Sequence, residues 1–96
     1  MKLLTQKIRK RLPPLGATNN QTDPVAIVKF FNPCGIGTWW AVEFDPDSGI
    51  FFGKADLGFS VLGSFSLEEL QGYVGPMGLG IERDIHFTPK PISQCK

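Results

Sequence analysis

Hydrophobic residues in the middle of the chain fall in short runs that are separated by turn-forming residues. Three of these runs contain an aromatic doublet: Phe30-Phe31, Trp39-Trp40 and Phe51-Phe52. Neighbouring side chains of a strand point to opposite faces of a sheet, so each doublet predicts one large ring on each face. Burying one such ring removes about 150–250 Å² from water. We therefore predict that both faces are covered, one by the core and the other by the chain's own helices, a second copy or a partner.

Runs of β-branched and aromatic residues predict three strands, at residues 25–31, 38–44 and 50–56. The segments between them, 32–37 and 45–49, are rich in proline, glycine and Asx residues, which is typical of turns. Short turns join antiparallel neighbours. The three strands should therefore form an antiparallel meander in chain order.

The first residues predict a short amphipathic helix. Leu4, Ile8, Leu12 and Leu15 recur at helical spacing, and Thr5 is suited to the N-cap position. The two prolines after Leu12 end the helix, because a residue that precedes proline is pushed out of α geometry. A helix of about two to three turns is marginal alone in water, so its leucine stripe is expected to dock on the sheet.

The second half of the chain predicts another strand, a short helix and a last strand. The apolar stretch 61–65 is the first of these. Ser66 and Glu69 match a capping box, which predicts a helix of about two turns that ends at one of the glycines after it. Residues 81–87 alternate between polar and apolar side chains, which predicts the last strand.

These elements predict an α+β fold with an antiparallel sheet of about four to five strands and a meander core. A short N-terminal helix precedes the meander, and a second short helix precedes the last strand. The 96 residues are expected to form a single domain, 1–96. Within it, residues 1–15 are the basic amphipathic helix and residues 88–96 are an extended tail.

The formal net charge of +1 hides an uneven distribution. The first eleven residues carry five cations and no acid, and the rest carries five basic and nine acidic residues, a net of −4. Such an arm can contact phosphates or an acidic protein surface, or it can be the solvated side of a helix. The cations that would contact nucleic acid are Lys7, Arg9, Lys10 and Arg11. The first three strands add only Lys29 and Lys54, so the basic groove of single-strand binders is not evident.

The cysteines, the hydrophobic runs and the paired glycines indicate where the protein is located and which cofactor chemistry is not expected. Cys34 and Cys95 are too few for a disulfide framework and are expected to be free thiols. Charges return directly after Leu4 and no run approaches membrane-spanning length, so a cytoplasmic location and no membrane contact are expected. The paired glycines lack the lysine or helix start of a phosphate loop, so no cofactor is expected.

Four acids are found in or near the second predicted hairpin: Glu43, Asp45, Asp47 and Asp56. Such a group could hold magnesium for phosphoryl chemistry, or it could imitate phosphates for a DNA-binding partner. The simpler interpretation is that Asp45 and Asp47 are turn residues and that Glu43 points outward. The candidate binding residues are Trp39, Trp40, Glu43, Asp45, Asp47, Asp56 and Arg83.

Glu82, Asp84 and His86 are expected on one face of the last strand and are suitable ligands for zinc, iron or manganese. Same-face neighbours on a strand are roughly 7 Å apart, so they share a metal only if the strand bends. The alternative is a polar, solvent-facing strand whose acids pair with Lys29 or Lys54. A single histidine also makes nucleophilic catalysis by serine or cysteine an unfavourable hypothesis.

Several segments together resemble a known family. They are Leu3-Leu4-Thr5, Asp23-Pro24-Val25, Val28-Lys29-Phe30-Phe31, Thr38-Trp39, Glu43-Phe44-Asp45, Phe51-Phe52-Gly53, Leu62-Gly63-Ser64-Phe65-Ser66-Leu67, Glu69-Leu70 and Gly78-Leu79-Gly80-Ile81-Glu82-Arg83-Asp84. The chain is similar to small uncharacterised proteins borne on plasmids, phages and integrative elements, the domain of unknown function number twenty-nine fifty-eight. The resemblance implies a mobile-element setting, in which small proteins interfere with host restriction or CRISPR systems by stoichiometric binding. It transfers no catalytic residue.

The leading hypothesis is a small cytoplasmic protein-binding module of a mobile genetic element that acts as a stoichiometric inhibitor of host defence. The expected partner is a host or mobile-element protein, and a homodimer is a further way to cover the second sheet face. One alternative is a metal-dependent enzyme that acts on nucleic acid or a nucleotide. Another is an accessory protein that binds nucleic acid through its basic arm.

Overall fold

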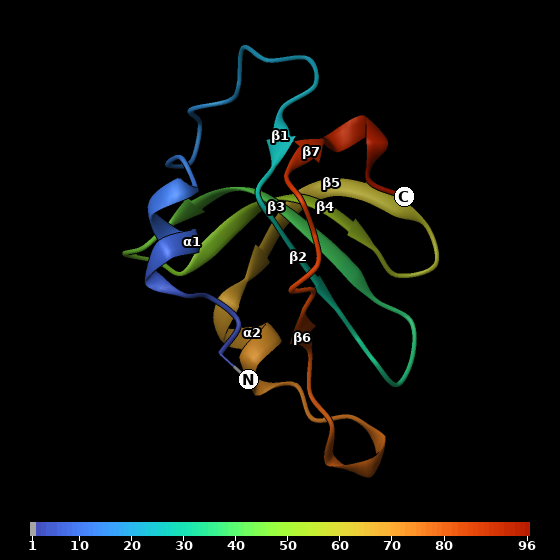
Figure 1. Cartoon of the computed structure of the whole chain (residues 1–96). Coiled ribbons are helices and arrows are strands. Elements are labelled where there is room, and N and C mark those ends of the chain that lie inside the picture. Colours follow the sequence, from blue (N-terminus) through green and yellow to red (C-terminus); the bar gives the residue numbers. More distant parts are fainter. Residues whose placement is uncertain (1) are drawn as a thin grey trace.

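The computed structural model describes residues 2–96, and its main feature is a five-stranded antiparallel sheet in the order β5-β4-β3-β2-β6 (Figure 1). Its strands are β2 (Val28–Phe31), β3 (Thr38–Asp45), β4 (Ile50–Asp56), β5 (Ser60–Ser66) and β6 (Glu82–Arg83). The predicted α+β class and the meander are confirmed, and the strand predicted at 50–56 has the expected bounds.

The strand predicted at 25–31 is divided in two. Its first part, β1 (Val25–Ala26), leaves the main sheet and pairs with β7 (Lys90–Pro91) in a small two-stranded sheet. Ile27 separates β1 from β2, and its backbone N–H donates to the carbonyl of Ala41 over 2.8 Å. A single stretch of chain therefore connects both sheets.

Two α-helices form where the caps predicted them. In α1 (Gln6–Arg11), the Thr5 hydroxyl accepts from the Ile8 N–H at 3.2 Å. In α2 (Leu67–Gly72), the Ser66 hydroxyl accepts from the Glu69 N–H at 3.2 Å. Two single 3₁₀ turns follow, η1 (Pro76–Gly78) and η2 (Ile92–Gln94). Within the described chain, no helix is long and apolar enough to cross a bilayer.

The two faces of the sheet carry two separate hydrophobic cores. The main core consists of buried side chains from the N-terminal segment, the sheet and α2: Leu3, Leu4, Leu12, Val28, Phe30, Ala41, Phe44, Phe51, Leu70 and Ile81. Trp39 packs against this core, whereas Trp40 belongs to the second one, with Ala26, Val42, Ile92 and Cys95. The prediction that the tandem tryptophans divide between the two faces is confirmed.

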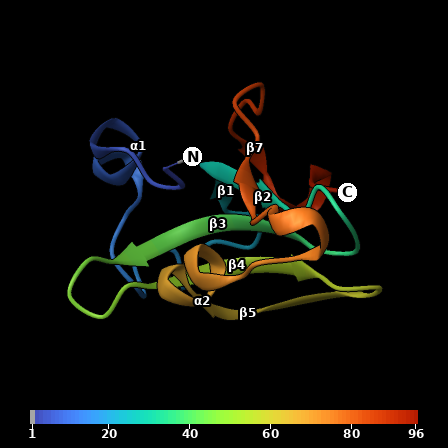
Figure 2. The same cartoon turned by 90° about the horizontal axis from the view of Figure 1, so that it is seen from below.

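The second core is closed by the chain's own C-terminal segment rather than by a helix. Residues 88–96 are not simply an extended tail, because β7 and η2 fold onto the sheet (Figure 2). Ile92 donates its N–H to the Pro24 carbonyl at 2.8 Å, and the Lys54 ammonium donates to the Cys95 carbonyl at 2.6 Å. Both cysteines are free, as predicted.

A β-bulge in β3 interrupts the regular alternation of side chains between the two faces of the sheet. Ala41 and Phe44 are three residues apart and would face opposite sides of a regular strand, yet both lie in the main core. The pairing with β4 shifts register between Ala41 and Glu43, which leaves one extra residue on β3. The bulge therefore returns Phe44 to the main core.

The last predicted strand is mostly wrong. Only Glu82–Arg83 pairs with β2, so the strand expected over 81–87 ends at Arg83. The Asp84 carboxylate accepts from the His86 N–H at 2.9 Å, and its carbonyl accepts from the Phe87 N–H at 3.2 Å. These bonds turn the chain away from the sheet.

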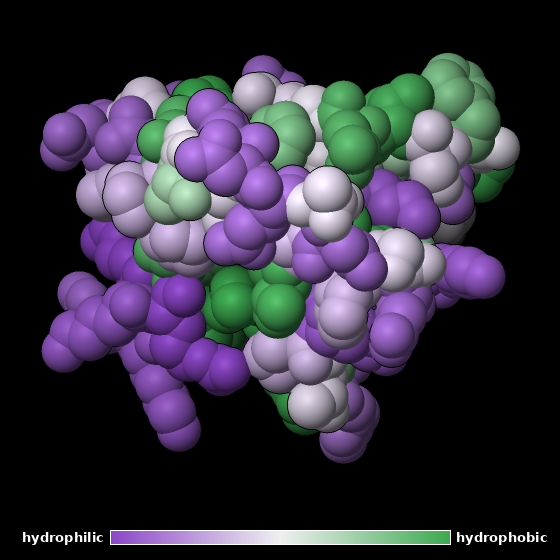
Figure 3. Space-filling model, turned by 90° about the horizontal axis from the view of Figure 1, so that it is seen from above, coloured by the Kyte–Doolittle hydropathy of each residue, from purple (hydrophilic) through white to green (hydrophobic). Residues whose placement is uncertain are grey.

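Hydrophobic side chains remain exposed at the β4–β5 hairpin. Leu57, Phe59 and Leu62 are 56%, 73% and 64% exposed. Figure 3 shows hydrophobic side chains gathered at the upper right of its view, where this hairpin lies. The fold thus covers both faces of the sheet near β3 but leaves this corner uncovered.

Gly53 provides a test of the packing between β3 and β4. A Cβ at this position would lie 1.9 Å from the Trp40 carbonyl oxygen, so Gly53→Ala requires a backbone shift at the centre of the sheet. We expect Gly53→Ala to lower the free energy of unfolding by about 3 kcal/mol or more, measured by urea denaturation.

The matched control is Gly63→Ala, because Gly63 lies directly opposite Gly53 on β5 and an added Cβ there meets nothing within 4 Å. This control should be neutral or gain about 0.5–1 kcal/mol, since alanine loses less conformational entropy than glycine. Equal midpoints for the two variants would contradict the packing described above.

Candidate functional site

An open groove of about 630 Å³ lies on the main-core face of the sheet, beside α2. Its floor is a cross-strand row in which Trp39 lies opposite Ala55 and Ala55 lies opposite Val61, with Phe65 further along β5. The Phe65 ring stacks on Phe51, with centroids 5.3 Å apart, so one side of the floor is anchored in the core. The groove floor is therefore continuous with the packed main core.

The β2–β3 turn is shaped around the indole of Trp39. Gly37 has a φ of +142°, a value that L side chains rarely adopt. A Cβ on Gly37 would lie 2.7 Å from the Trp39 ring. Glycine at this position thus permits both the turn and the close approach of the indole that lines the groove.

The walls of the groove come from the β2–β3 turn and from the segment after α2. Ile36 in the turn is 71% exposed, and Tyr73 follows the end of α2. The side-chain amide of Asn32 donates to the Tyr73 hydroxyl and to the Ile36 carbonyl, each at 3.4 Å. Glu69 is the one charged residue that lines the groove within the described chain.

Trp40, the other predicted aromatic contact, is 3% exposed and lies in the second core. Two ammonium groups lie over its ring, that of Lys54 at 5.5 Å and that of Lys29 at 5.9 Å from the centroid. Such contacts stabilise the cations next to the ring. Of the two tryptophans, Trp39 is the one that reaches the groove.

Glu43 is buried, at 2% exposed, so the expectation that it points outward is wrong. Its carboxylate accepts hydrogen bonds from the N–H of Gly16 at 2.8 Å, from the N–H of Thr18 at 2.8 Å and from the Thr18 hydroxyl. Burial by itself raises the pKa of Glu43, but these hydrogen bonds outweigh it and the pKa is lowered from its usual value. Glu43 fixes the loop after α1 to the C-terminal end of β3.

The other three acids of the predicted cluster do not gather around it. Asp45 accepts from the Ser48 hydroxyl at 2.7 Å and from the Asp47 N–H at 3.2 Å, and these bonds lower its pKa. Asp56 lies at the opposite end of β4 and accepts from the Gly58 N–H at 3.1 Å in the next turn. The acidic patch is therefore reduced to Asp45 and the exposed Asp47.

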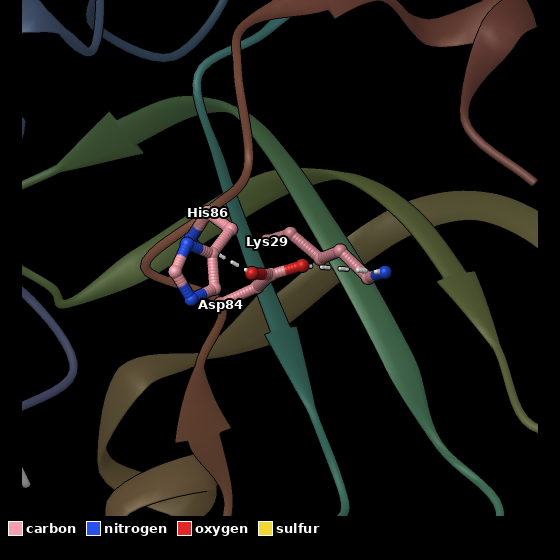
Figure 4. Close-up of polar contacts among 3 residues, drawn as sticks. All are labelled: Lys29, Asp84 and His86. Carbon is pink, nitrogen blue, oxygen red and sulfur yellow. Dashed lines mark hydrogen bonds and ion pairs between the residues drawn. The ribbon is translucent and has the colours of Figure 1, made fainter.

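The predicted metal ligands do not form one face of a strand (Figure 4). The Asp84 carboxylate lies 3.6 Å from the Lys29 ammonium, an ion pair between half-buried groups, and also accepts from the His86 backbone. The His86 ring lies on the other side of Asp84 from Lys29 (Figure 4). Among residues 2–96, no three His, Cys, Asp or Glu side chains form a group that could hold a metal ion.

The remaining predicted residues either bind the N-terminal segment through hydrogen bonds or lie on its exposed surface. The Arg83 guanidinium donates to the carbonyls of Lys2 at 2.5 Å and Leu3 at 3.3 Å. The four cations of α1 are exposed, and they are Lys7, Arg9, Lys10 and Arg11. The Arg9 guanidinium also lies 5.5 Å from the Phe44 ring centroid.

The family model described as a protein of unknown function, DUF2958, matches residues 3–95. The chain belongs to the DUF2958 family. The resemblance predicted from the sequence is thus confirmed, and the match includes every residue of the groove. No curated protein and no solved structure matches the chain.

The sequence predicted only Trp39 among the residues that line the groove. Ile36 is predicted in a turn and Val61 and Phe65 in a strand, and nothing in the sequence indicates that they share a surface with Tyr73. The signal in the sequence was the number of large apolar residues, because the chain has only one short helix before the meander and one after it to cover them. Their convergence depends on register, which becomes visible only in three dimensions.

Glu43→Gln tests the buried carboxylate. A glutamine amide cannot accept all three hydrogen bonds, so the N–H of Gly16 or of Thr18 loses its partner. We expect a loss of about 1–3 kcal/mol of unfolding free energy at pH 7, measured by urea denaturation. Glu68→Gln, at an exposed position of α2, is the control and should change little.

The pH dependence of these variants follows from the lowered pKa of Glu43. A carboxyl with a lower pKa in the folded state stabilises the fold above its unfolded pKa of about 4.3, and this contribution disappears as pH falls through the folded pKa. The difference between wild type and Glu43→Gln should therefore shrink below about pH 4. A constant difference down to acid unfolding would contradict the ionised state of Glu43.

Proposed function

We propose that this chain is a protein-binding module whose groove accepts the apolar side chains of a partner protein. The observation that carries the proposal is the lining of the groove, which is apolar and aromatic, contains a single charge and is open to solvent. Large exposed apolar surfaces on small proteins mark interaction sites. Tryptophan and tyrosine, here Trp39 and Tyr73, are also the residue types enriched at interface hot spots.

The chemistry of the lining favours protein over nucleic acid. A surface that binds nucleic acid needs cations along the phosphate path, and no lysine or arginine lines the groove within the described chain. The lining also lacks His86 and both cysteines, the side chains best suited to nucleophilic or general-base chemistry. Binding through apolar contacts is what this surface supports best.

The exposed apolar residues of the groove suit a partner that presents an apolar segment. Ile36 and Leu57, which are 71% and 56% exposed, belong to two turns at the same end of the sheet. The Asn32 amide and Glu69 provide polar atoms near this apolar centre. An apolar centre with a polar rim is the usual anatomy of a protein interface.

The mobile-element setting implied by the family resemblance makes a host defence protein the first partner to test. In this proposal the chain acts in the cytoplasm, binds one protein of a restriction or CRISPR system and inhibits it by occupation. A binding surface without catalytic groups supports an inhibitor that acts in stoichiometric amounts. The same groove would serve equally for a protein of the mobile element itself.

Ile36→Asp provides the test of the groove. The substitution puts a charge into an apolar contact, and it should preserve the fold because Ile36 is exposed. We expect at least about a tenfold loss of affinity for the partner, measured by titration calorimetry with the purified partner. Candidates come from quantitative affinity purification in the native host.

Val74→Asp is the matched control, because Val74 is also 71% exposed and lies outside the groove lining. It should keep the affinity of the wild type. If every captured protein binds both variants equally well, the groove is not the binding surface. If the partner is a defence protein, wild-type expression should raise plasmid transformation of the defended host, and Ile36→Asp should not.

Nucleic-acid binding is the second candidate function, because the cations of α1 are exposed and can contact phosphates. Deleting residues 1–11 is a poor test, because Leu3 and Leu4 are buried in the main core. Lys7→Glu with Lys10→Glu changes the charge of α1 and leaves the core intact. If α1 binds phosphates, oligonucleotide affinity should fall with salt and fall further in this variant, measured by fluorescence anisotropy.

The control for α1 is Lys90→Glu with Lys96→Glu, which changes the net charge equally at sites outside α1. Equal loss in both variants would indicate a general charge effect and would rule out a site on α1. Binding that is insensitive to salt would contradict phosphate contacts altogether.

A further inference from the structure

β5 is an open edge of the five-stranded sheet. It pairs with β4 through all seven of its residues, Ser60 to Ser66, and is the first strand in the order of the sheet. Figure 2 shows no segment beyond β5 on its outer side. Half of the backbone N–H and C=O groups of such a strand point away from the sheet, where they can pair with another strand.

The edges at β6 and β7 are protected. β6, at the opposite edge, has two residues, both charged, and Arg83 is bonded to the carbonyls of Lys2 and Leu3. β7 also has two residues, and one of them is Pro91. Short length, charge and proline are the usual means of blocking edge pairing. β5 has none of them, because its sequence, Ser-Val-Leu-Gly-Ser-Phe-Ser, contains no charge and no proline.

We propose that β5 pairs with β5 of a second copy of this chain, antiparallel about a two-fold axis at Gly63. In this register Val61 lies opposite Phe65 of the second copy, Leu62 lies opposite Ser64, and the serines at positions 60 and 66 lie opposite each other. All seven residues pair, and no charge is opposed. A β-branched residue opposite an aromatic one is a favourable cross-strand pair.

The sequence of β5 selects a second copy over an unrelated strand. Antiparallel pairing about Gly63 places Val61 and Phe65 of each copy opposite Phe65 and Val61 of the other, so on the groove face apolar residues meet apolar residues. An isologous contact of this kind closes after two copies and leaves no free β5 edge. An unblocked edge that stayed free would instead be an aggregation hazard.

The same arrangement covers the exposed corner of the molecule. The β4–β5 turn precedes Ser60, so antiparallel pairing carries it past Ser66 of the second copy, toward the start of that copy's α2. Leu57 and Phe59, the exposed apolar residues of this turn, would then lie against the second copy. The contact thus extends beyond the two strands.

This inference does not depend on the proposed function. Val61 and Phe65 face the groove, and directly opposed residues of an antiparallel pair share a face. The dimer would therefore bring two grooves together on one side of a continuous ten-stranded sheet, which follows from two copies of five strands. A partner protein could still enter from that side.

Sedimentation velocity over a range of concentrations tests the dimer. Wild type should sediment with twice the 10.6 kDa mass of the chain. The double variant Leu62→Lys with Ser64→Lys opposes like charges at two cross-strand positions, and both positions are exposed, so the fold should be kept. We expect its dimer dissociation constant to rise by roughly tenfold or more.

Charge exchange tests the register. The variant Leu62→Glu with Ser64→Glu should also be monomeric, and an equal mixture of the lysine and glutamate variants should form a dimer again, because each new acid opposes a new base. Val74→Lys, at an exposed site away from β5, should remain dimeric. A wild type that is monomeric at every concentration, or a dimer indifferent to these charges, would overturn the proposal. Failure of the mixture to pair would overturn the register about Gly63.

Discussion

Trp39 and Trp40 leave β3 on opposite faces of the sheet, and each indole requires apolar surroundings on its own side. A chain of 96 residues must therefore build two cores. The main core is closed by α1 and α2, and the smaller one by a segment that returns from far along the chain to bring Ile92 and Cys95 onto Trp40. With both helices on one side, little of the chain remains to cover the outer strands. The groove and the open β5 edge are the surfaces that this allocation leaves exposed.

The bulge in β3 has consequences beyond its own strand. It brings Phe44 into the main core, where its ring lies 4.6 Å from that of Phe51. The Glu43 carboxylate lies next to the backbone of residues 16–18, and three donors converge on it. On a regular strand Glu43 would share a face with Ala41 and point toward the main core. The bulge turns it away from that core, and it becomes an anchor for the loop instead. The loop after α1 is held by an ionised group instead of by apolar contacts.

The parts of the fold that depend on nearby residues could be predicted from the sequence. The caps at Thr5 and Ser66 and the strand β4 are of this kind, because each is determined by residues within a few positions. The early end of the last strand was missed although its cause is local, because the Asp84 carboxylate and carbonyl accept from the N–H groups of His86 and Phe87. The alternation of polar and apolar residues over 81–87 predicted a strand across this turn.

The same distinction applies to the candidate site. Trp39 was predicted because an aromatic doublet is visible in the sequence. The burial of Glu43 depends on Thr18, which is 25 residues away, and on a register shift that no local pattern reveals. The supposed acidic cluster failed for a related reason, because the length of β4 separates Asp56 from Asp45.

The tandem tryptophans also give the molecule two intrinsic fluorophores that are one peptide bond apart and report on different events. Trp39 borders the groove, so its emission would respond to whatever enters there. Trp40 lies beneath two ammonium groups and the C-terminal segment, and its emission would respond to detachment of that segment. Replacing Trp40 by phenylalanine leaves Trp39 as the single tryptophan, whose fluorescence reports on the groove side of the sheet. Replacing Trp39 instead leaves Trp40, whose fluorescence reports on the side covered by the C-terminal segment. Neither variant needs an added dye.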